Sequence, residues 1–342
     1  MSRRLRRMRR LSQRALSRRR FLVGAACTPV VLAGCAGEDA DPRSPVEGGT
    51  PGSASFEHGV ASGDPLADRV VLWTRVSGLT TETAVEWVLA TDPDLTDVVR
   101  RSGDGVDAAA AAGATAASDY TVKLDVTGLS AATTYYYQFR VGDVVSPVGR
   151  TRTAPAPGAE QVRFALVSCS NYSTGYVNAY KVLARRDIDA VIHVGDYFYE
   201  YGNSSDLGRD HFPPHEVVTL TDYRQRHAQY RTDPDLQAMT ATHPLIAVWD
   251  DHESTNNSWA DGAQNHQPET EGHWPERRAA ATRAYAEWLP IRLPEPDNPL
   301  RIWRHLSFGD LVDLLMLDTR LQRNTARLVR LFGLFALVVS LS

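Results

Sequence analysis

The stretch VIHVGDYFYEYG, residues 191–202, decides the fold expected for this chain. Its first half is a continuous apolar run, which is typical of a strand buried on both faces of a parallel sheet. The run ends at Gly195 and Asp196, and Tyr199 follows three positions later. Functional groups of open α/β sheets lie just beyond the carboxyl ends of the strands. The stretch therefore predicts a strand that delivers a carboxylate and a phenol to a functional edge, with Gly195 allowing close backbone approach.

Two further segments have the same design. VRFALVSCSN (162–171) and HPLIAVWDDHE (243–253) are apolar runs that end in polar residues. The segments between the runs, GYVNAYKVLARRD (175–187) and TLTDYRQRHAQYRTDPDLQAMTAT (219–242), have helical character. Apolar strands that alternate with helices indicate a mostly parallel sheet in an α/β domain. The three strand ends should then converge on one cleft.

The groups at these strand ends favour a metal centre. Cys169 follows the first run, Asp196 and Tyr199 the second, and Asp251 and His252 the third. Thiolate, carboxylate and phenolate ligands together favour trivalent iron over zinc or magnesium.

Each of these residues also has an ordinary structural interpretation. Asp196 could cap the following segment, Tyr199 or Tyr201 could be a core residue with a satisfied hydroxyl, and His252 could be structural. The weight of the metal hypothesis comes from the order in which the three groups occur along the chain.

The chain before this domain predicts an antiparallel β-sandwich over residues 56–153. The runs RVVLWTRV, AVEWVLAT, YTVKLDV and TYYYQFRV alternate apolar and polar residues and are separated by turn residues. TGLSAATTYYYQFRV (127–141) looks like the part of a fibronectin type III domain in which a leucine turn precedes a tyrosine-bearing strand. The alanine-rich residues 108–118 are expected to form a loop, and the proline-rich residues 150–161 a linker.

The N-terminus has the sequence pattern of an export signal. SRRRFL (17–22) places Arg18 and Arg19 in a twin-arginine pattern, a short apolar run follows, and LAGC (32–35) resembles a lipobox that would make Cys35 the lipidated first residue. The whole chain has 37 basic and 41 acidic residues. Because the first twenty residues are rich in arginine and lack acids, the remainder is acidic and is a poor surface for nucleic acid.

The three cysteines offer no intramolecular disulfide in the exported protein. Cys27 would leave with the signal and Cys35 would carry lipid, so Cys169 would remain alone. We therefore expect Cys169 to be either an inert buried thiol or a metal ligand.

The order of these motifs resembles that of the calcineurin-like metallophosphatases, and in detail that of the PhoD-like alkaline phosphatases. The strings that carry the resemblance are HGVASGDPLADRVVLWTR (58–75), SCSN (168–171), HVGDYFYEYG (193–202), VWDDHESTNNSWADGA (248–263) and LLMLDTR (314–320). The resemblance covers residues 56–320. It implies a four-layer αββα metallophosphatase fold, incomplete here, behind the N-terminal β-sandwich.

The resemblance also implies a phosphoester hydrolase with an Fe3+ and Ca2+ centre. Carried over by position, Cys169 and Tyr199 would hold Fe3+, and Asp196 would bridge the two metals. The metals would activate a water for attack on phosphorus.

The third motif would complete the centre. Asp251 stands where related enzymes have Asn and would ligate Ca2+, and Asn257 would contact Ca2+ or the substrate. His252 would contact the substrate or steady the leaving-group oxygen. The expected substrates are phosphate monoesters or diesters, including phospholipids or cell-wall polymers, with the twin-arginine export machinery as a further partner and membrane contact only through lipidated Cys35.

The predicted organisation has five parts. Residues 1–34 form a twin-arginine lipoprotein signal, 35–55 a flexible tether, 56–153 the β-sandwich, 154–320 the first part of the metallophosphatase domain, and 321–342 a divergent apolar tail. Related enzymes have further histidines and acids near the end of the domain, and this chain has no histidine after His305. We therefore expect a truncation or a change of reading frame after Arg320, with weak hydrolysis by the chain alone; a C-terminal hydrophobic helix is the alternative.

Two other functions compete with the hydrolase. A non-catalytic cell-surface binding protein with a degenerate metal site would explain the missing ligands, but not the unusual set that is present. An iron-dependent redox enzyme suits thiolate and phenolate ligands, but leaves the Asp-Asp-His-Glu motif unexplained.

Overall fold

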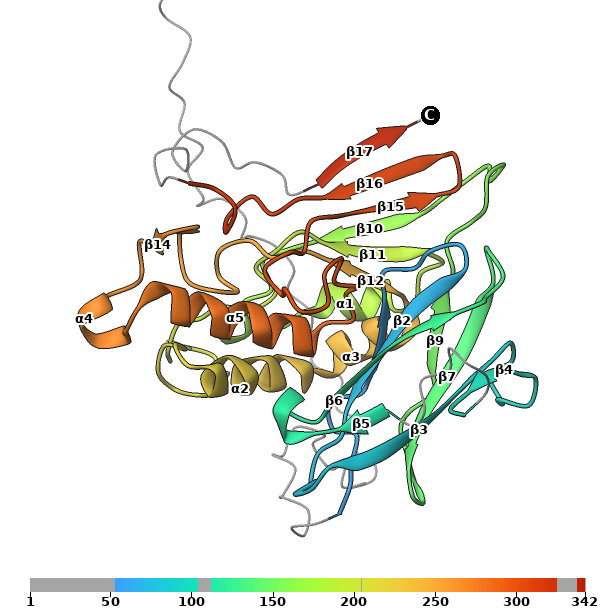
Figure 1. The fold of residues 1–342 in the computed structure, drawn as a ribbon, viewed down its shortest axis with the longest axis horizontal. Helices are drawn as coiled ribbons and strands as arrows, with labels where there is room; N and C mark the ends of the chain where they lie inside the picture. The colour runs from blue at the N-terminus through green and yellow to red at the C-terminus, as the bar shows by residue number, and fades with distance from the viewer. Residues whose placement is uncertain (1–52, 104–111, 204, 325–336, 342) are drawn as a thin grey trace, which may run out of the picture. The chain divides into compact units, whose positions relative to one another are not determined.

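The computed structural model describes residues 53–103, 112–203, 205–324 and 337–341 (Figure 1). The twin-arginine pattern, Cys35, nearly all of the predicted tether and part of the predicted tail lie outside these residues. Among the described residues, no helix is long and apolar enough to cross a membrane.

The N-terminal part consists of two antiparallel layers that pack face to face. One contains β1 (Val60–Gly63), β2 (Arg69–Arg75) and β6 (Thr121–Thr127). The other contains β3 (Thr83–Ala90), β4 (Val98–Arg101), β5 (Ala112–Ala114), β7 (Thr134–Val141), β8 (Val144–Val145) and β9 (Gly149–Arg152). Alternate residues such as Leu72, Leu124, Trp87 and Phe139 form one core between the layers. The predicted β-sandwich is therefore present, while its likeness to fibronectin type III stays a prediction.

A continuous sheet joins this part to the α/β part. Strands β10 (Phe164–Val167), β11 (Ala190–His193) and β12 (Leu245–Ala247) are parallel, as expected from the apolar runs. Strand β1 pairs with β12, so the strand order is β10-β11-β12-β1-β2-β6. The sequence suggested two units separated by a linker, but pairing of a strand from the first with an edge of the second makes one mixed sheet.

The helices follow the predicted segments with some differences. Their bounds are α1 (Asn178–Leu183), α2 (Leu220–Arg231), α3 (Pro234–Thr242), α4 (Pro268–Glu271) and α5 (Trp274–Trp288), with 3-10 turns η1 (Ala116–Ser118) and η2 (Tyr172–Thr174). The segment 219–242 divides into two helices because Asp233 caps a new N-terminus and Pro234 occupies its first turn. Helices α2 and α5 lie side by side, joined by a 3.1 Å hydrogen bond from Arg277 Nε to the Tyr223 hydroxyl (Figure 1).

Two smaller sheets complete the described fold. Strands β15 (Arg304–Phe308), β16 (Val312–Met316) and β17 (Leu337–Leu341) form an antiparallel sheet, and β13 (Ser258–Trp259) pairs with β14 (Gly262–Ala263). The rings of Phe164 on β10 and Phe308 on β15 meet edge to face, 4.8 Å apart. The end of the apolar tail is thus a paired strand and not a helix, since β16 offers it an edge. The full four-layer arrangement stays a prediction.

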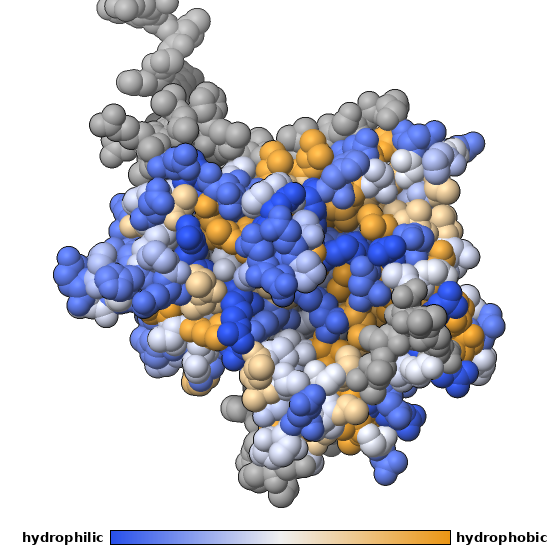
Figure 2. Space-filling view, in the orientation of Figure 1, coloured by the Kyte–Doolittle hydropathy of each residue, from blue (hydrophilic) through white to orange (hydrophobic). Residues whose placement is uncertain are grey.

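The surface shown in Figure 2 mixes hydrophilic residues with smaller hydrophobic patches. The more exposed large apolar side chains include Leu166 on β10 and Val182 on α1, at 59% and 51%.

Candidate functional site

The loops after β10, β11 and β12 meet at the carboxyl edge of the parallel sheet. The Cys169 N–H donates to the carbonyl of Gly195 at 3.2 Å, and the Ser170 N–H donates to that of Asp196 at 2.9 Å. Gly195 has φ 109°, and a Cβ there would lie 2.3 Å from the backbone nitrogen of Asp250. The prediction that Gly195 permits close backbone approach is confirmed, because a side chain would collide with the third loop.

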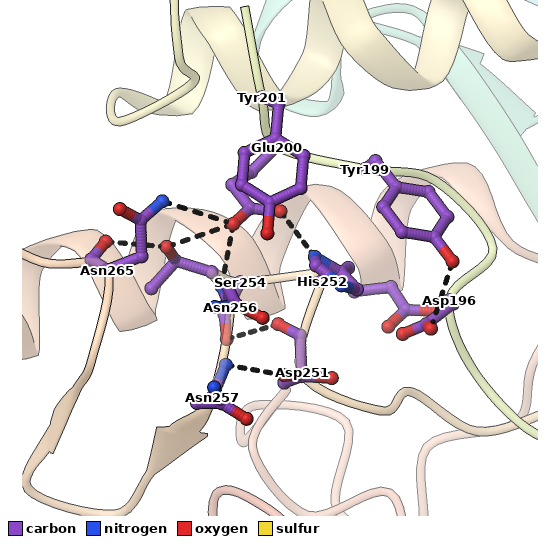
Figure 3. Close-up of polar contacts among 12 residues, drawn as sticks. Asp196, Tyr199, Glu200, Tyr201, Asp251, His252, Ser254, Asn256, Asn257 and Asn265 are labelled. Atoms are coloured by element: carbon purple, nitrogen blue, oxygen red, sulfur yellow. Dashed lines mark hydrogen bonds and ion pairs between the residues drawn. The ribbon is translucent and has the colours of Figure 1, made fainter. Parts of the chain in front are cut away.

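The two predicted iron ligands Cys169 and Tyr199 converge on the carboxylate of Asp196, the predicted bridging residue; Figure 3 shows the contact from Tyr199. Oδ2 of Asp196 accepts hydrogen bonds from the Tyr199 hydroxyl at 3.2 Å and from the Cys169 thiol at 3.4 Å. Cys169 is exposed, so the interpretation as an inert buried thiol is wrong. Oδ1 of Asp196 is buried and has no hydrogen-bond partner among the described residues. A bound cation would satisfy this oxygen, so the donor set fits a metal.

The third strand end supplies the other members of the cluster. Ligand atoms of Asp196, Asp251 and His252 lie within 4.8 Å of one another. Asn257 lies beside them, since its backbone N–H donates to Oδ2 of Asp251. Its side-chain amide donates instead to Gln264, so the structure places Asn257 at the edge of the cluster.

Glu200 holds His252 and was missed by sequence reasoning. Its side chain is fully buried, and Oε2 accepts from Nδ1 of His252 at 2.7 Å. Oε1 accepts from the backbone N–H of Asn256 at 2.7 Å and from Thr255 Oγ1 and Asn265 Nδ2, each at 3.3 Å. With Nδ1 engaged, Nε2 is the nitrogen of His252 left for the cluster. Glu200 lies within the opening stretch, but nothing local distinguishes it from a solvent-facing acid.

The charges around the Glu200–His252 pair favour a protonated imidazole. Burial lowers the pKa of His252, but its hydrogen bond to Glu200 and the negative charges of Glu200, Asp196 and Asp251 outweigh this effect and raise that pKa to about 9. Burial raises the pKa of Glu200, whereas the contact with His252 and backbone donors bring it below its ordinary value.

Without a bound metal, the pKa shifts of the acidic groups next to the Glu200–His252 pair favour their neutral forms. Burial raises the pKa of Asp196, and the carboxyls of Asp250 and Asp251 raise it further against the opposing effect of His252. Partial desolvation of the side chain, together with Asp196, also raises the pKa of the Cys169 thiol, although the residue as a whole is exposed, and that of the Tyr199 phenol. A multivalent cation would reverse these shifts by favouring the ionised forms.

Arg320 is a second residue that sequence reasoning left without a role. It belongs to the LDTR string, and its Nη2 lies 2.8 Å from Oδ2 of Asp250 and 3.3 Å from Oδ1 of Asp251. Its Nη1 is buried without a partner among the described residues. Arg320 therefore offsets part of the negative charge at the third strand end.

The backbone is strained at three of the predicted ligands. Cys169, Asp196 and Asn257 have φ values of 59°, 54° and 53°. Residues other than glycine rarely adopt this left-handed region, and such strain clusters at functional sites.

The fold and the site together define a class: an α/β protein with an acidic centre, suited to cations, at the carboxyl edge of parallel strands. Family models agree, with PhoD-like phosphatase matching residues 164–332 and the PhoD-like phosphatase N-terminal domain matching residues 43–155. The chain belongs to the PhoD-like phosphatase family.

Two relatives define the extent of this similarity. The chain is 40% identical over 293 residues to alkaline phosphatase D of Bacillus subtilis (strain 168), covering 80% of this chain and 48% of that protein. It matches a solved structure of PhoD with a TM-score of 0.72 and 38% identity, covering 81% of this chain and 54% of that one. The chain thus spans about half the length of these relatives.

Proposed function

We propose that this chain is a metal-dependent phosphoester hydrolase whose centre binds Fe3+ and Ca2+. The observation that carries the proposal is the convergence of the Cys169 thiol and the Tyr199 phenol on Asp196, whose second oxygen is buried without a partner. Thiolate with phenolate is an unusual set that suits ferric iron. Asp251 would add an oxygen ligand of the kind that calcium requires, and Asn257, whose backbone N–H donates to Asp251, is close enough to add another.

Two overlapping groups of residues would hold the two metals. Cys169, Tyr199 and Asp196 would hold iron, and Asp196, Asp251 and Asn257 would hold calcium. When bound, the two cations would activate a water and neutralise charge on the phosphoryl group.

His252 acts on the leaving group. Its Nδ1–H donates to Glu200, which keeps the ring protonated and fixes its orientation. Its Nε2–H then donates a proton to the departing ester oxygen. Arg320 balances Asp250 and so limits the repulsion of an anionic substrate.

The test is elemental analysis of the purified protein with an absorbance scan for a charge-transfer band from thiolate or phenolate to iron. We expect bound iron and such a band, with loss of both in Cys169→Ser and Tyr199→Phe. Tyr176→Phe is the matched control, because this tyrosine is 51% exposed. Hydrolysis of chromogenic phosphate mono- and diesters by the loaded protein then identifies the substrate class. Protein that folds without metal and is equally stable with it would instead support a non-catalytic binding role.

We also propose export by the twin-arginine route and anchoring through lipid on Cys35, on the strength of the sequence pattern at residues 17–35. Several acyl chains on one cysteine suffice for stable membrane attachment. Cys35→Ala should move the protein from the membrane fraction to the medium or periplasm. Retention on the membrane would contradict the lipid anchor.

A further inference from the structure

A buried arginine binds the backbone of the loop that carries Tyr199 and Glu200. Arg226 lies on α2 and is 0% exposed. Its guanidinium donates to five backbone carbonyls, those of Tyr199, Tyr201, Phe212, Pro213 and His215. The distance is 2.9 Å from Nη1 to the carbonyl of Tyr201 and 2.9 Å from Nη2 to that of Pro213.

These carbonyls belong to two limbs of one loop, residues 199–203 and 212–215. The limbs also contact each other, since the Asn203 N–H donates to the carbonyl of Pro214 at 2.9 Å. Gly202 allows this approach, because a Cβ there would lie 2.8 Å from the same carbonyl oxygen. Arg226 thus closes the base of the loop by bonding both limbs at once.

The first limb carries the groups on which the site depends. Tyr199 directs its phenol to Asp196, and Glu200 directs its carboxylate to His252. Residues 199–203 belong to no helix or strand, so no regular hydrogen-bond ladder fixes their backbone. Their placement must come from tertiary contacts, and Arg226 bonds the carbonyls of Tyr199 and Tyr201 on either side of Glu200.

The chemistry of this contact requires arginine. In the described part of the chain, no carboxylate forms an ion pair with Arg226. Its direct contacts are the five carbonyls, and the carboxylates of Glu200 and Asp222 act on its charge only from a greater distance. Five N–H groups in a rigid plane match five carbonyls, whereas lysine has three N–H groups. Burying a cation without an ion-paired carboxylate costs folding free energy. Here the guanidinium holds the two limbs of the loop together.

We propose that Arg226 is a positioning residue that fixes the backbone of residues 199–202 and thereby aims Tyr199 and Glu200 into the site. The role of Tyr199 as an iron ligand rests on the proposed function. The effect of Arg226 on the loop backbone does not depend on the proposed function. Either proposal can therefore be wrong while the other holds.

The same helix supplies a matched control. Arg231 is 1% exposed, and its Nη2 donates to the carbonyls of His58 at 2.9 Å and Val60 at 3.4 Å. It therefore makes the same kind of contact to an N-terminal strand and not to the site loop. Arg226→Lys and Arg231→Lys should both lower the unfolding midpoint.

The decisive measurement is hydrogen–deuterium exchange of the peptide over residues 199–203 in the metal-free protein. We expect Arg226→Lys to speed its exchange about tenfold and Arg231→Lys to change it less than about twofold. With iron added, only Arg226→Lys should weaken the charge-transfer band. Unchanged exchange in Arg226→Lys, or an equal rise in both variants, would overturn the proposal.

Two further outcomes are interpretable. If Arg226→Lys does not fold, Gly202→Ala is the second variant, because its added methyl group pushes the two limbs apart while Arg226 stays in place. It should speed hydrogen–deuterium exchange over residues 199–203. Unchanged exchange in this variant would contradict the proposal that contact between the limbs fixes the loop. If the wild-type protein binds no iron, the proposed function fails, while the exchange comparison still decides the role of Arg226.

Discussion

At the scale of single residues, the site depends on backbone conformations that only particular residues tolerate. Cys169, Asp196 and Asn257 all adopt left-handed φ values, and Gly195 precedes Asp196 with φ 109°. The sequence identified the glycine because its position after an apolar strand is informative by itself. It also identified Cys169 but left open whether this thiol is buried and inert or a metal ligand, because burial depends on what packs over the loop.

Gly195→Ala should destabilise the protein by at least about 2 kcal/mol, since it adds a left-handed φ penalty to a backbone collision. The added Cβ would lie 2.3 Å from the backbone nitrogen of Asp250. Gly208→Ala is the control, because Gly208 also has positive φ, at 68°, but nothing lies within 4 Å of an added Cβ. It should cost about 1 kcal/mol. Urea unfolding followed by tryptophan fluorescence measures both; equal losses would show that the collision relaxes freely.

At the scale of elements, helix α2 links the site to the rest of the fold. It begins with a capping box, in which the Thr219 hydroxyl accepts from the Asp222 N–H and the Asp222 carboxylate accepts from the Thr219 N–H. The helix then presents Arg226 to the site loop and Arg231 to β1. The sequence predicted helix here from its polar, helix-forming composition, but not the division at Asp233 or the targets of the buried arginines.

Thr219→Ala should cost about 1 kcal/mol of folding free energy, because it leaves an N-terminal N–H of α2 without its acceptor. Thr221→Ala, at an exposed position in the first turn, should change stability by less than about 0.5 kcal/mol. The two variants are compared by their urea midpoints. A loss no larger in Thr219→Ala than in Thr221→Ala would mean that water replaces the cap.

At the scale of the whole described fold, buried charge joins the N-terminal and α/β parts. Asp64 follows β1 and is 0% exposed. Its carboxylate accepts two bonds of 2.7 Å from Arg304 of β15 and one of 2.6 Å from the Arg292 N–H. Together with the pairing of β1 and β12, this contact makes the two parts mutually dependent.

Asp64→Asn should lower the free energy of unfolding by about 3–5 kcal/mol, because it leaves the buried Arg304 without a counter-charge. Asp125→Asn is the control, since Asp125 pairs with Arg292 but its side chain is 35% exposed. Its loss should stay below about 1 kcal/mol. Denaturation followed by circular dichroism should show one transition in each variant. Two separated transitions in Asp64→Asn would show that the parts unfold independently.

Three buried histidines should make the fold sensitive to acid. Burial lowers the pKa of His58, His193 and His227 to about 3 each, from 6.5. Because the folded pKa lies below the unfolded one, the stabilisation is complete above pH 6.5 and is lost as the pH falls toward 3. At pH 5.5 each histidine should cost about 1.4 kcal/mol relative to pH 8.

His227 provides the check on this acid sensitivity. Both of its ring nitrogens are buried without hydrogen-bond partners among the described residues, and its ring stacks on Trp288 with an interplanar angle of 9°. His227→Phe should therefore reduce the stability lost between pH 8 and pH 5.5 by about 1.4 kcal/mol. An unchanged pH dependence would mean that His227 is not neutral in the folded protein.

The sequence alone determined the strand ends and the candidate ligands placed on them, because apolar runs and the residues that terminate them are local features. Cys169, Asp196, Tyr199, Asp251 and His252 could all be proposed on that basis. Only the tertiary structure decided which other groups reach the site. The pairing of Glu200 with His252, the arginine clamp on residues 199–202, the strand β17 and the sheet shared by both parts bring together positions far apart in the chain. Such contacts depend on how the elements pack, and no local pattern encodes them.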